Sequence, residues 1–178
     1  MNILIRQENP ADYQAVFEVV EAAFRNEVIS DQTEQFLVER LRKSDAFVPE
    51  LSIVAELDGE IVGHILLTKI KITNEVESFD SLALAPVSVV PNFQNKGIGG
   101  QLIREAHQRA KNLGFKSIVL LGHENYYPRF GYEWISKYGI ELPFNAPQQN
   151  CMVMELVEDG LKGVNGMVVY DKAFFETT

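Results

Sequence analysis

The most informative part of this chain is the sequence Val87-Ser88-Val89-Val90-Pro91-Asn92-Phe93-Gln94-Asn95-Lys96-Gly97-Ile98-Gly99-Gly100. An apolar strand leads into a short polar turn, and the turn becomes glycine-rich where an amphipathic helix begins. The first backbone N–H groups of such a helix have no partner inside it, and the helix dipole adds about half a positive charge there. Glycines let the main chain approach a ligand because no Cβ intervenes. The stretch therefore predicts a phosphate-binding loop.

Two other glycine-rich loops fit this stretch poorly. A dinucleotide fingerprint needs Gly-x-Gly-x-x-Gly with an acidic residue about 20 positions later, and a P-loop closes with Gly-Lys-Ser/Thr. Here Lys96 precedes Gly97, and neither Ser nor Thr follows directly. One structural alternative stays open, in which the glycines serve only to let a strand and a helix pack closely.

The residues after the loop predict a helix and then a strand. One side of the helix is apolar, through Ile98, Leu102, Ile103, Ala106, Ala110 and Leu113, and Gly114 is placed to end it. The apolar run 117–121 follows at once. A strand, a helix and a strand at this spacing predict a parallel pair with a crossover helix, which binds ligands outside the carboxyl ends of its strands.

Apolar periodicity predicts the other elements, and we expect a single domain spanning residues 1–178. A first strand is expected at 3–5, followed by a helix that Asn9 and Pro10 begin. A second helix is expected at 32–43, capped by Asp31 and buried through Phe36, Leu37 and Leu41. Strands are expected at 51–57 and 61–72, joined by an Asp58-Gly59 turn, and at 82–90, 132–135, 139–142, 152–157 and 167–170.

Composition limits the possible partners. The net charge of −9 argues against nucleic-acid binding, which depends on neutralising phosphates. Between residues 92 and 116, however, five basic residues accompany one acidic residue, so the predicted loop lies in a locally basic region. The single cysteine, Cys151, allows no internal disulfide and is expected in the core. We find no signal peptide or membrane span and expect a cytoplasmic protein without a membrane partner.

A second motif follows the strand at 117–121 and has the sequence Gly122-His123-Glu124-Asn125-Tyr126-Tyr127-Pro128-Arg129-Phe130-Gly131-Tyr132. The spacing Gln94-x-x-Gly97-x-Gly99 resembles the acetyl-coenzyme A pyrophosphate loop of the GNAT superfamily of N-acetyltransferases. In that superfamily a tyrosine typically precedes a Gly-Phe or Gly-Tyr pair by four residues, as Tyr127 precedes Gly131-Tyr132. The Tyr-Tyr-x-Arg-Phe-Gly form is similar to the YhbS-type branch.

The resemblance implies a fold and a site. The fold is α/β (α+β), acyl-CoA N-acyltransferase-like, with a mixed, splayed central β-sheet flanked by helices and with acetyl-CoA as cosubstrate between the splayed strands. The resemblance makes Tyr127 the general acid, with Tyr126 as the neighbouring alternative because Pro128 follows. The residues implied to bind acetyl-CoA are Val87, Ser88, Val89, Gln94, Asn95, Lys96, Gly97, Ile98 and Gly99, the first three through their main chains.

The chemistry of acetyl transfer adds further requirements. A lysine-like amine must lose a proton, at a cost of roughly 4–5 kcal/mol at pH 7, so a base or a water held by one is needed. Glu124, His123 and Asp80 are the candidates. The Val89 amide is placed to stabilise an oxyanion. His64 is expected in the core and His107 on the surface, and no Cys/His spacing predicts a metal site.

Three functions remain possible at this point. The first is N-acetylation of a small-molecule or protein amine by a monomer or homodimer. The second is a noncatalytic acyl-CoA-binding or regulatory module. The third is a nucleotide-binding protein that uses the same loop for another phosphate. The acidic net charge favours a cationic acceptor.

Overall fold

The structure, a computed structural model, describes residues 1–28 and 30–177. Its strands are β1 (Leu4–Gln7), β2 (Phe47–Leu57), β3 (Glu60–Thr73), β4 (Ser78–Val89), β5 (Ser117–Leu121), β6 (Glu133–Trp134), β7 (Ile140–Glu141), β8 (Cys151–Glu155) and β9 (Gly166–Val169). Its α-helices are α1 (Tyr13–Phe24), α2 (Glu34–Arg42) and α3 (Ile98–Asn112). The strands form one mixed sheet in the order β1-β2-β3-β4-β5-β8-β6, and β9 pairs with both β3 and β7.

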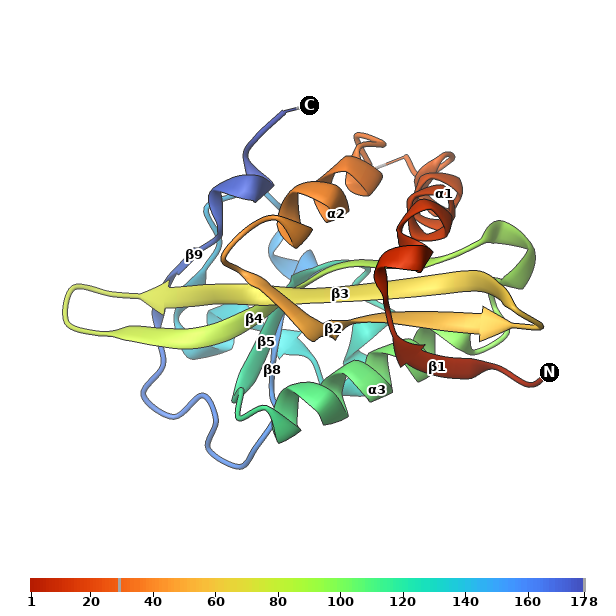
Figure 1. Ribbon diagram of the computed structural model, residues 1–178. Coiled ribbons are helices and arrows are strands. Elements are labelled where there is room, and N and C mark those ends of the chain that lie inside the picture. The colour runs from red at the N-terminus through yellow and green to blue at the C-terminus, as the bar shows by residue number, and fades with distance from the viewer. Residues whose placement is uncertain (29, 178) are drawn as a thin grey trace.

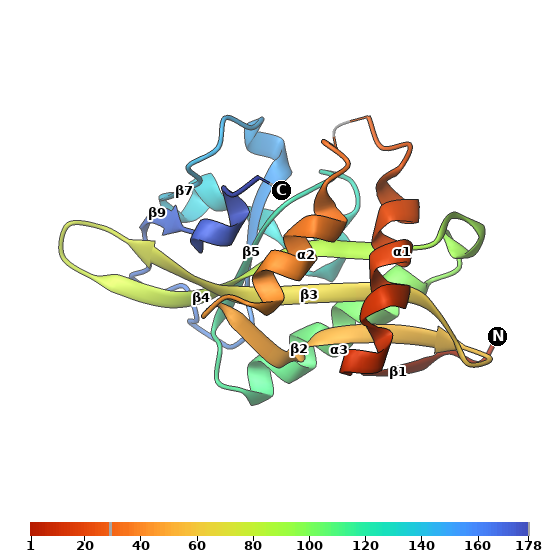
Figure 2. The same cartoon turned by 45° about the horizontal axis from the view of Figure 1, so that its top comes forward.

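The helices cover the two faces of this sheet. Helix α3 lies on one face, while α1 and α2 lie on the other (Figure 1). Figure 2 shows α1 and α2 crossing above β3 and β4. The C-terminal turn Lys172–Phe174 packs beside α2, where the Nε of Arg40 donates a hydrogen bond to the Ala173 carbonyl oxygen (3.0 Å).

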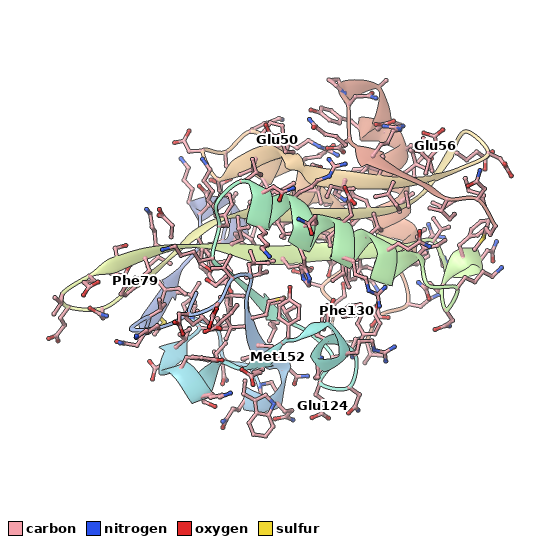
Figure 3. The ribbon with its side chains drawn as sticks, turned by 90° about the horizontal axis from the view of Figure 1, so that it is seen from below. Glu50, Glu56, Phe79, Glu124, Phe130 and Met152 are labelled. Atoms are coloured by element: carbon pink, nitrogen blue, oxygen red, sulfur yellow. The ribbon has the colours of Figure 1, made fainter. Side chains whose placement is uncertain are left out.

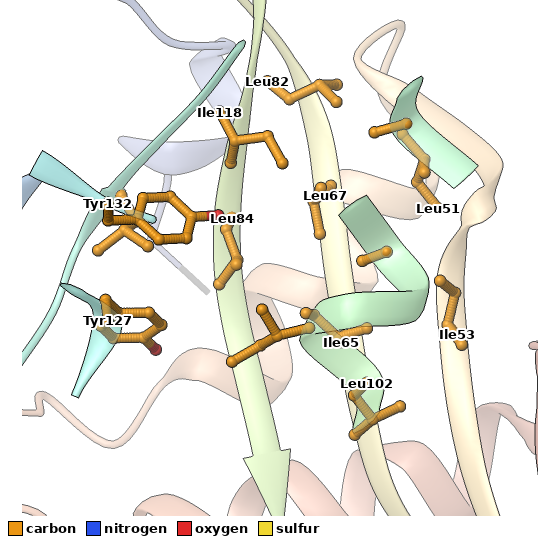
Figure 4. Close-up of a cluster of buried hydrophobic side chains, with 14 of the residues drawn as sticks. Leu51, Ile53, Ile65, Leu67, Leu82, Leu84, Leu102, Ile118, Tyr127 and Tyr132 are labelled. Carbon is orange, nitrogen blue, oxygen red and sulfur yellow. The ribbon is translucent and has the colours of Figure 1, made fainter. Parts of the chain in front are cut away.

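The largest hydrophobic cluster lies between α3 and the sheet, and Figure 4 shows part of it. The side of α3 that faces the sheet is buried as the sequence predicted, through Ile98, Leu102, Ile103, Ala106 and Ala110. The predicted Leu113 instead lies just after the helix and is exposed. Gly114 has a φ of +93° just after the helix, which suits the left-handed position at a helix end. This packing fixes where the N-terminus of α3 lies relative to β4.

Strands β4 and β5 are parallel, as the strand–helix–strand pattern predicted. They pair only at Leu82 with Ile118 and at Ala83 with Val119, although β4 continues to Val89. Against β3, the register moves from Leu67–Leu84 to Ile65–Val87, so β4 carries one extra residue there. Such a bulge bends the strand that contains it. The carboxyl-terminal part of β4 is therefore left without a β5 neighbour, which is the splayed sheet that the resemblance implied.

Most predicted elements are present, with shifted ends. The Asp58-Gly59 turn joins β2 and β3, with φ of +51° and +85° at the two residues. Asn9 caps the short 3-10 turn that leads into α1, and its Oδ1 accepts from the Ala11 amide (3.0 Å). The strand predicted at 117–121 matches β5. The four strands predicted near the C-terminus match β6 to β9, of which β6, β7 and β8 are shorter than predicted and β9 is shifted by one residue.

The second helix is where the sequence interpretation was wrong. It begins at Glu34 rather than residue 32, and its N-cap residue is Thr33. The Asp31 carboxylate instead accepts from the Thr33 amide (3.0 Å), outside the helix. The buried residues of α2 are Gln35, Val38 and Leu41, so Leu41 is buried as predicted. Phe36 and Leu37 are only partly buried, with Leu37 packed against the same cluster.

Candidate active site

The loop between β4 and α3 presents backbone donors. Asn95 and Gly97 have φ of +61° and +84°, so the chain turns sharply before the helix. The first hydrogen bond inside α3 runs from the Gln101 amide to the Gly97 carbonyl oxygen (3.1 Å). The amides of Ile98, Gly99 and Gly100 therefore have no acceptor within the helix. Together with the helix dipole, they make this end of α3 suited to an anion.

The free edge of β4 lies beside these donors. The Val90 amide donates to Val62 of β3 (3.0 Å). Because backbone groups alternate in direction along an antiparallel strand, the N–H and C=O groups of Val89 and Val87 point away from β3. They face the side from which β5 has diverged. The Val89 carbonyl accepts from Gln94 Nε2 (2.9 Å), which ties the loop to the strand and leaves the Val89 amide available.

Ser88 differs from its two neighbours. It pairs with His64 of β3, so its main-chain groups face β3 rather than the gap. Its side chain is buried, and because Val87 and Val89 pack against the cluster under α3, alternation along the strand puts Ser88 on the opposite face of the sheet. The geometry therefore gives main-chain groups of Val87 and Val89, and not those of Ser88, to a ligand lying along this edge.

Side chains around the loop come from α3 and from the segment after β5. A Cβ added at Gly99 would lie 3.1 Å from Tyr126 Oη and 3.9 Å from Val89 Cγ2, so this glycine lies where β4 and the Tyr126 segment converge. The Lys96 ammonium lies 5.3 Å from the centre of the Phe93 ring. Figure 3 shows Phe130 beside the start of α3. The surroundings of the donors are thus basic and aromatic.

Tyr127 is the first residue of a 3-10 turn, Tyr127–Phe130, and its side chain is 8% exposed. Its ring makes edge-to-face contacts with Tyr126 (centroids 5.0 Å apart) and Tyr132 (5.8 Å). Within the described residues no protein group hydrogen-bonds its hydroxyl. In Figure 4 that hydroxyl is directed toward the arrowhead end of β4. Burial raises the pKa of Tyr127 above its usual value, so the phenol stays protonated at neutral pH.

His107 contacts the tyrosine cluster through Tyr132 and is half-buried, whereas the sequence predicted a surface position. Its Nε2 and the Tyr132 hydroxyl are 2.8 Å apart, and burial lowers the pKa of His107 to about 4. Tyr132 in turn packs against Tyr127. His107 lies on α3, so this contact links the helix that presents the backbone donors to the tyrosine cluster.

The three candidates for the base lie in different places. Asp80 forms an ion pair with Lys71 near the start of β4. It is nine residues from Val89, which is about 30 Å along an extended strand, so Asp80 is not part of this site. His123 and Glu124 are exposed in the loop after β5. Figure 3 shows Glu124 at the outer edge of that loop.

His64 is a core residue, as expected. It is fully buried, its Nε2 lies 3.0 Å from Ser52 Oγ, and Ser52 donates to the carboxylate of Glu8 (2.6 Å). Burial lowers the pKa of His64 to about 3. Cys151 is likewise buried. In the part of the chain that the structure describes, no cluster of three or more His, Cys, Asp or Glu side chains is arranged to hold a metal.

No helix among residues 1–28 and 30–177 combines the length and the apolar character that crossing a membrane requires.

Gly122, which contacts Tyr127, and Asn150, which holds Gly122, were not singled out in the sequence. A Cβ added at Gly122 would lie only 2.4 Å from Tyr127 Cε2, so the ring occupies the space that a side chain would need. Asn150 donates from Nδ2 to the Gly122 carbonyl oxygen (3.0 Å). The glycine directly after a predicted strand was a usable signal, because glycine at a strand end often marks a close approach. Asn150 had no comparable signal.

The chain is similar in sequence to known proteins. Residues 14–132 match the Acetyltransferase (GNAT) family. The uncharacterized N-acetyltransferase YjhQ of Escherichia coli K12 is 35% identical over 122 residues, 67% of each chain. YhbS of the same strain, also uncharacterized, is 25% identical over 172 residues, covering 97% of this chain and 98% of YhbS.

Two solved structures are similar over nearly the whole chain. The crystal structure of YhbS from Escherichia coli in complex with CoA has a TM-score of 0.86 at 26% identity, covering 100% of this chain and 94% of YhbS. A GNAT family acetyltransferase from Brucella melitensis in complex with acetyl-CoA has a TM-score of 0.78 at 34% identity, covering 97% and 98%. With its splayed β4–β5 pair and the family match over residues 14–132, this chain belongs to the acetyltransferase (GNAT) family.

Proposed function

We propose that this protein transfers the acetyl group of acetyl-CoA to a primary amine of a small molecule or a protein. The main support is the row of backbone amides at the start of α3, which lies beside the free edge of β4. The amides at the start of α3 suit a pyrophosphate, and the free edge of β4 suits a pantetheine arm. The similar YhbS and Brucella structures, which are complexes with CoA and acetyl-CoA, agree with this assignment.

Binding uses the loop and the strand edge together. The amides of Ile98 and Gly99, with those of the preceding loop residues Asn95 to Gly97, hold the pyrophosphate, and Lys96 adds a nearby positive charge. Gln94 keeps the loop against β4 through its bond to Val89. The main chains of Val87 and Val89 pair with the pantetheine arm. The Val89 amide also donates to the thioester oxygen, whose negative charge grows as the amine attacks.

Tyr127 supplies the proton that the leaving sulfur needs. The amine nitrogen forms a bond to the thioester carbon, the C–S bond breaks, and the thiolate takes the Tyr127 phenol proton as it leaves. The new amide nitrogen then loses its extra proton, which returns through water to the Tyr127 phenolate and restores the acid. Thiols have a reference pKa near 8.5 and tyrosines near 10, and burial raises the pKa of Tyr127 further. Full proton transfer in the free protein is therefore uphill, so the proton moves as the C–S bond breaks.

The amine must lose a proton before or during its attack. Glu124 is the third residue after β5 and is exposed, so a water bound to its carboxylate can take that proton and pass it to solvent. The net charge of −9 favours a cationic acceptor, because the field of the protein steers such a ligand toward it.

A thiol-release assay tests the proposal. The purified protein is mixed with acetyl-CoA and with spermidine, free lysine, an N-terminal peptide amine or an aminoglycoside, and free CoA thiol is followed over time. Amine-dependent release supports the proposal. Binding without release with any amine would point to a noncatalytic acyl-CoA-binding module. A melting shift with ATP or NAD but not with acetyl-CoA would contradict both interpretations.

A further inference from the structure

The residue that follows β5, Gly122, is hydrogen-bonded to Asn150 in an unusual way. Leu121 pairs with Cys151 of β8, so the next pair along the ladder is Gly122 with Asn150. The Gly122 amide donates to the Asn150 carbonyl oxygen (2.9 Å), as the antiparallel pattern requires. The return bond does not come from the Asn150 amide, because that amide donates to Pro147 (3.0 Å).

The side chain of Asn150 supplies the missing bond. Its Nδ2 donates to the Gly122 carbonyl oxygen at 3.0 Å, so Asn150 holds Gly122 through both its main chain and its side chain. Since β4 has diverged from β5 at this level, β8 is the neighbour that fixes the end of β5. Gly122 is thus held at a defined distance from β8.

Gly122 is also the surface on which Tyr127 lies. A Cβ at this position would be 2.4 Å from Cε2 and 2.9 Å from Cδ2 of Tyr127, closer than real Cβ contacts. Tyr126 and Tyr132 flank the same ring edge-to-face. The ring is therefore enclosed on several sides, and the position of Gly122 decides how far its hydroxyl extends toward β4.

We infer that Asn150 is a positioning residue for acetyl transfer, acting on Tyr127 through Gly122. The inference rests on the proposed role of Tyr127 as general acid. Removing the Nδ2 bond leaves the Gly122 carbonyl without its partner, the end of β5 shifts, and the Tyr127 hydroxyl no longer meets the leaving sulfur. Misplacement by about 1 Å can cost an enzyme about 10²-fold in rate. Binding of acetyl-CoA by the α3 amides is left intact, because Asn150 does not contact that loop.

A double-mutant cycle on the full chain tests this inference. Asn150→Ala is made alone, Tyr127→Phe is made alone, and the two are combined. Each variant is assayed for thiol release with the fastest amine of the panel. The slower thiol release without amine, in which water hydrolyses acetyl-CoA, is measured as well. Asn74→Ala is the matched control, because Asn74 Nδ2 also donates to a distant carbonyl, that of Asn165 (3.1 Å), at the β3–β4 turn.

The expected result has three parts. Asn150→Ala alone lowers kcat about tenfold and leaves KM for acetyl-CoA nearly unchanged. In the Tyr127→Phe background the same substitution has little further effect. Asn74→Ala keeps normal kcat. Thermal unfolding of each variant verifies folding, and if Asn150→Ala does not fold, Asn150→Asp replaces it in the cycle, because it keeps the shape of the side chain and removes the Nδ2 donor.

Three results would overturn the inference. An equal loss of kcat in both backgrounds, or no loss in either, would show that Asn150 does not act through Tyr127. A near-normal kcat for Tyr127→Phe alone would instead remove the general acid itself, and with it the inference. The first two outcomes leave the proposed acid in place, so the two failures can be told apart.

Discussion

The substitution Gly99→Asp should weaken acetyl-CoA binding through charge, and Gly99→Asn provides a neutral control of the same shape. A Cβ at Gly99 would lie 3.1 Å from Tyr126 Oη and 3.9 Å from Val89 Cγ2, so both side chains enter the gap beside the α3 amides. The steric effect is common to the two variants. The difference between them therefore measures how strongly a negative charge at this position opposes a bound anion.

The size of this difference can be estimated. Two unit charges 4 Å apart interact by about 1 kcal/mol in water and about 4 kcal/mol at an effective dielectric constant of 20. The aspartate variant should therefore bind acetyl-CoA between about fivefold and about 10³-fold more weakly than the asparagine variant. Salt screens exposed charges, so the difference in affinity between the two variants should become smaller as NaCl is raised from about 0.05 to about 0.5 M. These concentrations lie on either side of the roughly 0.1 M at which the Debye length is about 10 Å.

Isothermal titration calorimetry with acetyl-CoA measures both affinities directly, and circular dichroism verifies that each variant is folded. Equal affinities for the two variants at low salt would refute the assignment of the anion site to the start of α3.

Three further predictions concern stability and proton transfer. Gly97→Ala places a Cβ in open space but at a φ of +84°, so it should cost about 1–2 kcal/mol of stability and lower Tm by about 2–8 °C in a thermal melt; an unchanged Tm would contradict this. Glu124→Gln should make the fall of kcat/KM at acidic pH less steep. An unchanged pH profile and an unchanged rate would exclude Glu124 as the residue that holds the proton-accepting water. Burial lowers the pKa of His107 to about 4, so the unfolded chain takes up its proton first and stability should fall as pH falls from about 6.5 toward 4. Urea unfolding at several pH values should show that the stability of His107→Gln falls less steeply with decreasing pH than that of the unchanged protein. An identical dependence of stability on pH in the two proteins would argue against a buried neutral His107.

The sequence predicted well wherever local chemistry alone decides the structure. The strand 117–121, the apolar side of α3 and the Asp58-Gly59 turn all follow from periodicity and turn propensity, and all are present. The backbone donors at the start of α3 follow from the same local pattern. The buried side of α2 follows only in part, because packing against Leu66 and Val54 of the sheet buries Val38 together with the predicted Leu41 and leaves Phe36 partly exposed.

Contacts between distant segments could not be predicted. His107 is polar and lies among polar neighbours in sequence, yet its ring is partly buried by its contact with Tyr132. Asn150 meets Gly122 only because β8 pairs with β5. The direction of the Ser88 main chain depends on the β3–β4 register. In each case the deciding partner lies more than 20 residues away, where one sequence gives no pairing information.

The change from Tyr127 to phenylalanine tests the central claim most directly, because it removes only the hydroxyl and keeps the ring that fills the space above Gly122. General-acid assistance commonly contributes about 10²–10⁴-fold. Steady-state thiol release and acetyl-CoA titration should therefore show kcat reduced by at least about tenfold with an almost unchanged acetyl-CoA affinity. A near-normal kcat would contradict the account, because it would leave Tyr127 with a packing role only.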